Sequence, residues 1–169
     1  MDILKLVDVS KIYGELKALD KINLSVEKGE WISIMGPSGS GKTTMMNIIG
    51  AMDKPSLGEV ILDGEDIAKK SPKELTVIRR DKIGLIFQQF HLVNYLSALE
   101  NVMMSQYYHS MPDAQEAMEA LAAVGLADRA KHLPNQLSGG EQQRVCIARA
   151  LINHPTICLL YTSPSPRDS

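Results

Sequence analysis

The segment 31–50 constrains the fold more than any other part of the chain. Its first residues, Trp-Ile-Ser-Ile-Met at 31–35, are an apolar run that predicts a short strand. Residues 36–43 are Gly-Pro-Ser-Gly-Ser-Gly-Lys-Thr, and a helical pattern runs from Lys42 to a closing Gly50. Strand, glycine-rich loop and helix in this order are typical of an α/β fold.

Residues 36–43, which we call the phosphate loop, match the pattern G-x-x-x-x-G-K-[ST]. Three glycines let the backbone curve so that its N–H groups point inward around a polyphosphate: Gly36, Gly39 and Gly41. The helix that begins at Lys42 directs its N-terminal dipole at the same place. The alternative is a glycine turn without function, which would not require a strand before it and a helix after it.

Individual side chains of the loop suit a nucleotide as well. Lys42 supplies a positive charge for the β- and γ-phosphates, and the Thr43 hydroxyl is a possible Mg²⁺ ligand. Pro37 fixes one backbone dihedral angle and has no N–H to donate. We therefore predict nucleotide binding.

Strand and helix patterns alternate along the rest of the chain. The expected strands are 3–10, 18–27, 59–62, 82–87 and 156–160, and the expected helices are 71–80, 97–108, 112–125 and 138–153. Ser–Glu capping boxes open three of the helices, at Ser71/Glu74, Ser97/Glu100 and Ser138/Glu141. The pattern predicts an α/β domain with a largely parallel core and an antiparallel N-terminal portion. The strand at 156–160 is expected beside the strand at 31–35.

Composition places the chain among soluble intracellular proteins. It has 169 residues, 44% of them hydrophobic, and a net charge of −2, which gives no reason to expect a nucleic-acid partner. The basic run at 78–82 favours a solvated helix end. No apolar run approaches the ~18 residues that span a bilayer, and the N-terminus has no secretory pattern. Cys146 and Cys158 form no disulfide framework, which fits a reducing cytoplasm.

Residues 137–141, Leu-Ser-Gly-Gly-Glu, form a second informative segment. Ser138 and Glu141 are a capping box, so a plain helix start is one interpretation. Two adjacent glycines, each costing about 1 kcal/mol in a helix, are not needed for a cap. At a helix N-terminus they permit close approach of the backbone to an anion, which indicates a second phosphate contact.

With both segments present, residues 2–157 resemble the ATP-binding subunits of ABC transporters, and residues 137–141 are similar to the signature segment of that family. The resemblance implies a P-loop NTPase core of ABC type with an antiparallel β portion and a helical subdomain at about 89–153. It also implies a head-to-tail dimer that holds ATP and Mg²⁺, in which the signature segment of one copy contacts the γ-phosphate held by Lys42 of the other.

Specific residues follow from the resemblance. Tyr13 is expected to stack on adenine, although a strand-end tyrosine is the plainer interpretation. Gln88 is expected to sense Mg²⁺ and water and to couple to the membrane subunit. The implied nucleotide-binding residues are Tyr13, Gly36, Pro37, Ser38, Gly39, Ser40, Gly41, Lys42, Thr43 and Thr44. The implied ATP contacts across the dimer are Leu137, Ser138, Gly139, Gly140 and Glu141, and the implied Mg²⁺ ligands are Thr43 and Gln88.

Segments such as Ile-Met-Gly-Pro-Ser-Gly-Ser-Gly-Lys-Thr-Thr resemble the lipoprotein-release and macrolide-export branch of the family. This branch implies a membrane-spanning partner and a place on the inner face of the cell membrane, with ATP hydrolysis driving a mechanical stroke. Two alternatives remain open: a soluble ABC-type ATPase that acts on ribosomes or DNA, and a nucleotide-binding module that does not hydrolyse.

The last residues depart from the family pattern. In the family, a buried strand ends in Asp-Glu, and a switch histidine follows further on. The aspartate orients Mg²⁺ and the glutamate polarises the attacking water. In this chain, Tyr161 and Thr162 occupy the positions where the two carboxylates are expected. Residues 158–168 match one reading frame of a transposon-end sequencing adapter. We therefore predict a native domain at 1–157, a non-native tail at 158–169, and no hydrolysis by the chain as written.

Overall fold

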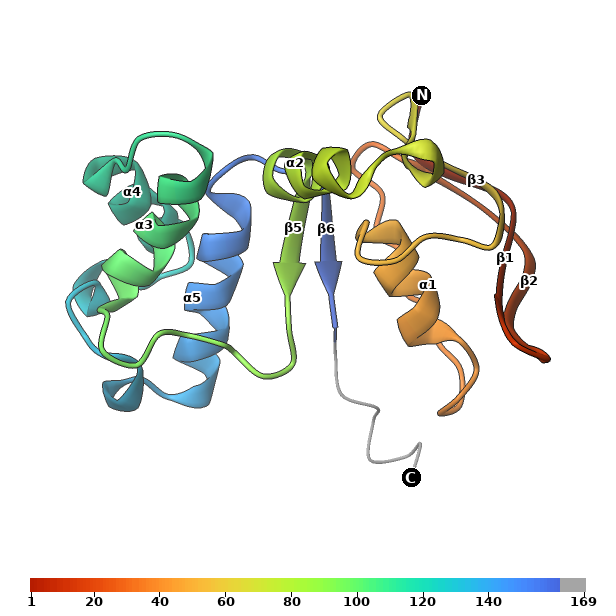
Figure 1. Cartoon of the computed structure of the whole chain (residues 1–169). Coiled ribbons are helices and arrows are strands. Elements are labelled where there is room, and N and C mark those ends of the chain that lie inside the picture. The colour runs from red at the N-terminus through yellow and green to blue at the C-terminus, as the bar shows by residue number, and fades with distance from the viewer. Residues whose placement is uncertain (162–169) are drawn as a thin grey trace. The chain divides into compact units, whose positions relative to one another are not determined.

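The computed structural model describes residues 1–161, which form two compact units (Figure 1). The first unit is Met1–Arg79, and the second begins at Arg80. The phosphate loop lies in the first unit, and the signature segment, residues 137–141, lies in the second.

A four-stranded antiparallel sheet forms the body of the first unit. Its strands are β1 (Asp2–Tyr13), β2 (Leu16–Glu27), β3 (Leu57–Leu62) and β4 (Glu65–Asp66), in the order β2-β1-β3-β4. Leu4 and Leu6 of β1 are buried and Lys5 between them is exposed, as a strand with one covered face requires. The alternation breaks between Leu6 and Val9, where the register with β2 shifts. Leu4 lies opposite Leu62 and Leu6 opposite Val60, and all four are buried. The structure confirms the antiparallel N-terminal portion.

Helix α1 (Lys42–Ile49) follows the phosphate loop and is confirmed, with Gly50 as its C-cap. Ile48 and Ile49 are its buried residues. A single-turn helix, η1 (Ile67–Lys69), and helix α2 (Pro72–Lys82) complete this part of the chain. The predicted capping box of α2 is present: the Ser71 N–H donates to the Glu74 carboxylate at 2.7 Å, and the Glu74 N–H donates to the Ser71 hydroxyl at 3.3 Å.

The strand predicted at residues 31–35 is absent, which corrects the sequence interpretation. These residues have no regular structure; Trp31 is 94% exposed and Met35 is 87% exposed. No described strand pairs with the segment, so its backbone groups lack ladder partners and its apolar side chains have no sheet face to cover. The expected pairing with residues 156–160 is therefore also wrong.

Two parallel strands begin and end the described part of the second unit. Strand β5 (Ile83–Ile86) pairs with β6 (Ile157–Leu160), and the two arrows run side by side in Figure 1. Strand β6 extends beyond the predicted domain boundary at Ile157, and Cys158 pairs with Gly84. Because Cys-Leu-Leu is apolar, it suits a strand beside β5 whatever its origin.

Three helices with a shared core form the rest of the second unit, and all three are confirmed: α3 (Ala98–His109), α4 (Ala114–Ala123) and α5 (Gly139–Leu151). Two single-turn helices, η2 (Ala127–Arg129) and η3 (Pro134–Gln136), connect α4 to α5. The core includes Val102 of α3, Leu121 of α4 and Val145 of α5, each fully buried. Within residues 1–161, none of the helices combines the length and the hydrophobicity that a membrane span requires.

Candidate nucleotide site

The phosphate loop is a tight turn that its own lysine closes. The Ser40 N–H donates to the Pro37 carbonyl at 3.2 Å, which forms the turn. The Lys42 ammonium reaches back and donates to the carbonyl of Gly36, at the start of the loop. Ser38 and Ser40 are exposed. The loop therefore presents polar groups and a cation at one place on the surface.

Two of the glycines are required by the local backbone. Gly39 has φ +79° and Gly41 has φ +91°, a region that residues with a Cβ rarely adopt. A Cβ at Gly41 would also lie 2.5 Å from the carbonyl oxygen of Ala18 and 3.1 Å from the Leu19 side chain. The loop thus packs directly on β2, and glycine at 41 sets the point where α1 begins.

The start of α1 suits a polyphosphate. Its N-cap, Gly41, has no side chain to accept from the first-turn N–H groups, and the first turn contains no acidic residue. Those N–H groups and the Lys42 ammonium match phosphate oxygens in charge and hydrogen bonding. Thr43 is exposed and Thr44 is half-buried. A hydroxyl at Thr43 is a hard oxygen ligand of the kind that Mg²⁺ accepts beside phosphates.

Tyr13 lies at the end of β1 in a polar cluster with two partners. Its hydroxyl donates to Asp53 Oδ2 at 3.2 Å, and the Lys11 ammonium lies 5.2 Å from the centre of its ring. Tyr13 remains half exposed. The tyrosine is therefore held at its hydroxyl, with a cation against the ring. No pattern in the sequence linked it to Asp53, which is 40 residues away.

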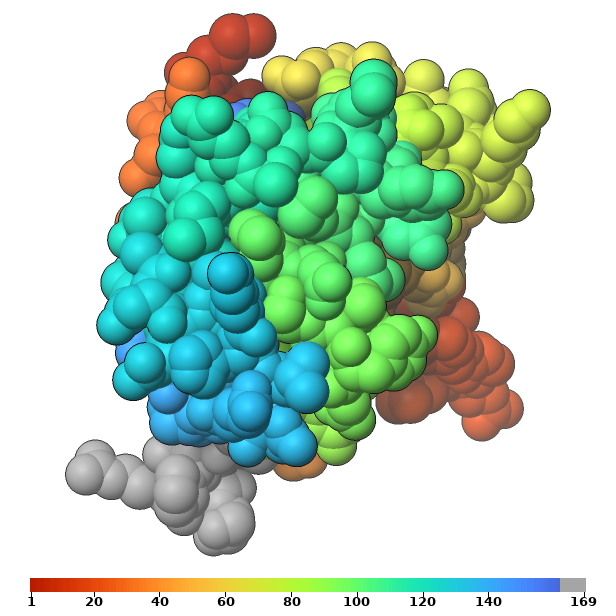
Figure 2. Space-filling model, turned by 90° about the vertical axis from the view of Figure 1, so that its left-hand side faces the viewer, coloured from red at the N-terminus to blue at the C-terminus, as the bar shows by residue number. Residues whose placement is uncertain are grey.

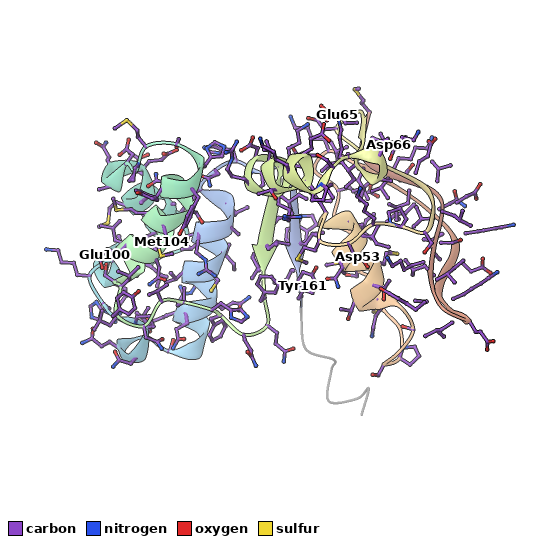
Figure 3. The ribbon with its side chains drawn as sticks, in the orientation of Figure 1. Asp53, Glu65, Asp66, Glu100, Met104 and Tyr161 are labelled. Carbon is purple, nitrogen blue, oxygen red and sulfur yellow. The ribbon has the colours of Figure 1, made fainter. Side chains whose placement is uncertain are left out.

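Asp53 is the anionic centre of this cluster (Figure 3). Lys11 Nζ donates to Asp53 Oδ1 at 3.0 Å, and the Lys54 N–H donates to the same oxygen at 2.8 Å. Partial burial would raise the pKa of Asp53, but Lys11, Lys54 and Tyr13 together hold that pKa below its ordinary value. The cluster therefore stays charged and fixed at neutral pH.

Gln88 follows β5 and is exposed, as is Gln89. The preceding Phe87 makes an edge contact with His91, with ring centroids 5.4 Å apart, and stacks on Tyr161 at 5.3 Å. We call residues 87–91 the glutamine loop. It lies in the second unit, with the signature segment, whereas the phosphate loop and Tyr13 lie in the first.

Tyr161 stands directly after β6, where the family pattern places an aspartate. Its N–H donates to the Ile86 carbonyl at 2.9 Å, which continues the pairing of β5 with β6 (Figure 3). Burial raises the pKa of the Tyr161 phenol, so this side chain is neutral at physiological pH. The predicted substitution of Thr162 for the family glutamate lies outside the described residues.

The signature segment opens α5 through the predicted capping box. The Glu141 N–H donates to the Ser138 hydroxyl at 3.1 Å, and the Ser138 N–H donates to Glu141 Oε1 at 3.0 Å. Arg129 donates to the other carboxylate oxygen at 3.1 Å. The main-chain N–H of Ser138, its hydroxyl and then Arg129 lower the pKa of Glu141. Each carboxylate oxygen of Glu141 therefore accepts a hydrogen bond, one from the Ser138 N–H and one from Arg129.

The remaining signature residues divide into one buried side chain and two open glycines. Leu137 is buried in the helical core. Gly139 and Gly140 are exposed, and a Cβ at either position would meet nothing within 4 Å. Their φ values are not in the left-handed region. Neither strain nor crowding inside the chain therefore explains these two glycines.

Metal-binding clusters of the usual kind are missing from residues 1–161, where no group of three or more His, Cys, Asp or Glu could hold an ion. A Mg²⁺ site would therefore rely on hydroxyl, amide and phosphate oxygens. Thr43 and Gln88, the two predicted ligands, offer oxygens of these types.

Comparison with known proteins identifies the family. The sequence profile described as "ABC transporter" matches residues 19–160. The lipoprotein-releasing system ATP-binding protein LolD of Bacteroides thetaiotaomicron is 48% identical over 160 residues, covering 93% of this chain and 73% of the relative. The macrolide export ATP-binding/permease protein MacB of Chlorobaculum tepidum is 45% identical over 161 residues, covering 92% of this chain and 25% of the relative. These relatives confirm the predicted subfamily.

Solved structures agree with the sequence relatives. A dimeric structure of the ATP-binding cassette MJ0796 in a post-hydrolysis state, bound to ADP and Pi, matches with a TM-score of 0.81 and 49% identity. The match covers 93% of this chain and 72% of that chain. A second structure, cbiO1 of Clostridium perfringens, matches with a TM-score of 0.85 and 28% identity. This match covers 94% of this chain and 64% of that chain. With these matches and its phosphate loop, this chain belongs to the ABC transporter family as an ATP-binding subunit.

Proposed function

We propose that the protein couples the binding and hydrolysis of MgATP to work by a membrane-spanning partner. The observation that carries the proposal is the start of α1, where Gly41 packs on the Ala18 carbonyl and leaves the first-turn N–H groups without a side-chain cap. Lys42 adds the cation that the β- and γ-phosphates require. Tyr13, half exposed and fixed by Asp53, is the proposed platform for adenine.

Magnesium, when bound, neutralises charge between the β- and γ-phosphates and orders them for transfer. We propose that the Thr43 hydroxyl of the first unit would hold it; Gln88 lies in the second unit and stays a ligand predicted from the family resemblance. The other residues of the phosphate loop orient the triphosphate through main-chain N–H groups.

A second copy of the chain is the proposed partner at the γ-phosphate. Gly139 and Gly140 leave the two positions between the capping residues Ser138 and Glu141 without side chains, although nothing within the chain requires this. A phosphate held by another copy is a ligand of the right charge for that helix start. The Ser138 hydroxyl would contact the same phosphate. The dimeric state of the MJ0796 cassette supports this arrangement.

The membrane partner is supported by the relatives and by an apolar surface of the second unit. Tyr107, Tyr108 and Met111, at the end of α3 and just beyond it, are 70%, 69% and 85% exposed. Figure 2 shows the face of the helical unit on which α3 appears in green and α4 in cyan. Exposed aromatic and methionine side chains favour a protein contact. The name of the MacB relative joins an ATP-binding part to a permease. We therefore propose a place on the cytoplasmic face of the membrane.

For the chain as written, we propose nucleotide binding without turnover. Tyr161 takes the position of the predicted aspartate and carries no negative charge at neutral pH. Loss of a group that positions the attacking water costs orders of magnitude in rate. This favours nucleotide binding without hydrolysis for the sequence as printed, and hydrolysis for a chain that carries the family's Asp-Glu at positions 161 and 162.

The test is ATP binding to the native full-length protein by calorimetry, comparing Lys42→Ala with Lys69→Ala. Lys69 is an equally charged lysine of the first unit, 74% exposed and paired with Glu59 and Asp66. We expect Lys42→Ala to weaken binding by roughly one to two orders of magnitude, because a charge-assisted contact is worth about 1.5–3 kcal/mol. Lys69→Ala should bind as the native protein does. Equal affinity of all three proteins would refute the assignment of the loop.

A further inference from the structure

We propose that Arg149 is a positioning residue that fixes the glutamine loop to helix α5, so that Gln88 and the signature segment move as one body. The inference rests on the proposed role of Gln88 in the ATPase reaction. It assigns to Arg149 a function that acts through Gln88 and not through contact with ATP.

Arg149 donates hydrogen bonds to two successive carbonyl groups of the glutamine loop. Its Nη2 donates to the Phe90 carbonyl at 2.9 Å, and its Nη1 donates to the His91 carbonyl at 3.0 Å. Both bonds are charge-assisted, and the planar guanidinium fixes the direction of each donor. The bond to the Phe90 carbonyl is partly buried, so solvent competes less for it than for the exposed bond to the His91 carbonyl.

A second side chain of α5 strengthens the same attachment. The Cys146 thiol, which is buried, donates to the Phe90 carbonyl at 3.0 Å. Burial raises the pKa of this thiol, and the Arg149 charge opposes that shift only in part, so the thiol keeps the proton that it donates. The Phe90 carbonyl therefore accepts from two residues of one helix.

The two glutamines lie between fixed points of the backbone. On one side, the Ile86 carbonyl at the end of β5 accepts from the Tyr161 N–H at 2.9 Å. On the other side, the Phe90 carbonyl is held by α5. Gln88 and Gln89, both exposed, span the short distance between these anchors. A shift of Phe90 relative to Ile86 would therefore move Gln88.

Two further features show that contacts with the neighbouring helices hold this part of the chain in its conformation. His91 has φ +50°, which costs a non-glycine residue on the order of 1 kcal/mol or more. Its carbonyl is nevertheless one of the two that Arg149 binds. Just beyond, the buried Asn101 side chain binds the Val93 N–H at 2.8 Å and the Val93 carbonyl at 3.2 Å. The chain just after the glutamine loop is therefore held by α3, while the loop itself is held by α5.

Helix α5 joins this attachment to the signature segment. Ser138 is its N-cap, and Arg149 lies in its last turn. At a rise of about 1.5 Å per residue, the two are about 16 Å apart along one continuous helix. A rigid displacement of α5 therefore carries both Ser138 and Phe90. An ATP contact at one end is transmitted to Gln88 at the other without a change inside the helix.

A simpler role for Arg149 would be to place a positive charge at the C-terminus of α5, where it stabilises the helix dipole. Lysine would serve that purpose equally well. Lysine would not hold two carbonyl groups in a fixed geometry, because its ammonium sits on a flexible chain. Arg149→Lys therefore separates the two roles.

The experiment measures MgATP turnover by the native full-length protein and three variants: Arg149→Lys, Gln88→Ala and the double variant. We expect Arg149→Lys to lower kcat by about tenfold, with KM for ATP within about twofold, because misplacement of a catalytic group affects the transition state. In the Gln88→Ala background, Arg149→Lys should cause no further fall. If the two effects multiply in the double variant, or if Arg149→Lys is as active as the native protein, the inference is wrong.

Arg144→Lys is the matched control. Arg144 is on the same helix and also donates to a main-chain carbonyl, that of Val124, at 3.1 Å. It does not hold the glutamine loop, so its kcat should stay within about twofold of the native value. A tenfold fall in this variant would show that any arginine of α5 has the same effect, which overturns the special role of Arg149.

Hydrogen exchange of the amides of residues 87–91 gives a readout that does not depend on activity. Arg149→Lys should speed exchange in this segment, whereas Arg144→Lys should not; equal exchange in both would contradict the attachment. Failure of the proposed function is distinguishable, because it would appear as absent ATP binding by the native protein, or as unchanged binding in Lys42→Ala. The inference about Arg149 fails, while the proposed function stands, if Gln88→Ala slows turnover and Arg149→Lys lowers kcat further in the Gln88→Ala background.

Discussion

Gly41 faces the carbonyl oxygen of Ala18 so closely that a Cβ at position 41 would lie 2.5 Å from that oxygen. The start of α1 therefore packs against the main chain of β2 at Ala18 and against the Leu19 side chain. This packing sets the direction in which the first N–H groups of α1 point, and therefore where a phosphate can bind. The glycine serves the fold and the site at the same position.

Replacement of Gly41 should accordingly cost more than replacement of Gly39. Both have positive φ, so alanine at either is strained by about 1–2 kcal/mol. Only at 41 does the added Cβ overlap backbone; at 39 it meets nothing within 4 Å. We expect Gly41→Ala to lower the free energy of unfolding by roughly 3 kcal/mol or more and Gly39→Ala by about 1 kcal/mol. Denaturant unfolding of the native protein checks this, and equal losses would contradict the close packing.

Gly140→Ala should have opposite effects on stability and activity. Its Cβ would meet nothing within 4 Å, and alanine favours a helix over glycine by up to about 1 kcal/mol. The variant is therefore expected to melt at a higher temperature than the native protein. Turnover of MgATP should fall at least tenfold, because the Cβ projects where the phosphate of a second copy would approach. A variant that is both more stable and fully active would mean that no ligand approaches this glycine.

Local features of the fold were predictable from sequence because their causes are local. The capping boxes at Ser71, Ser97 and Ser138 are all present, since each depends on residues three positions apart. The phosphate loop begins its helix at Lys42 for the same reason. Apolar alternation also predicted β1 and β2. It did not predict the register shifts between them, such as the one between Leu6 and Val9.

Features that depend on distant partners were not predictable. Residues 31–35 have an apolar pattern, yet a strand forms only where another strand pairs with it, and none of those described does so. Arg149 looks like an ordinary basic residue in the last turn of a helix. Its acceptor at Phe90 is 59 positions away, and no sequence pattern connects the two. Asp53, which holds Tyr13 and Lys11, was missed for the same reason.

The helix start at the signature segment should depend on pH through Glu141. Hydrogen bonds from Ser138 and Arg129 lower the pKa of Glu141 below its ordinary value of 4.5. A lowered folded-state pKa stabilises the fold at pH values above 4.5, and this contribution is lost as the pH falls below 4.5 through the folded pKa. Glu141→Gln keeps an amide that can cap but does not titrate, so stability should fall less steeply on acidification. A carboxyl resonance of Glu141 that titrates at or above 4.5 would contradict the account.

The central claim, that one catalytic site takes its phosphate loop and its signature segment from two copies of the chain, is tested most directly by the concentration dependence of turnover. The measurement is MgATP hydrolysis per subunit by the native full-length protein, from nanomolar to micromolar protein, with Ser138→Arg beside it. Activity per subunit should rise with protein concentration and then level off as dimers form. Ser138→Arg should bind ATP as a monomer but stay inactive throughout, because the side chain fills a site used only between copies. Activity per subunit that is constant over the whole range, together with an active Ser138→Arg, would show that each chain works alone.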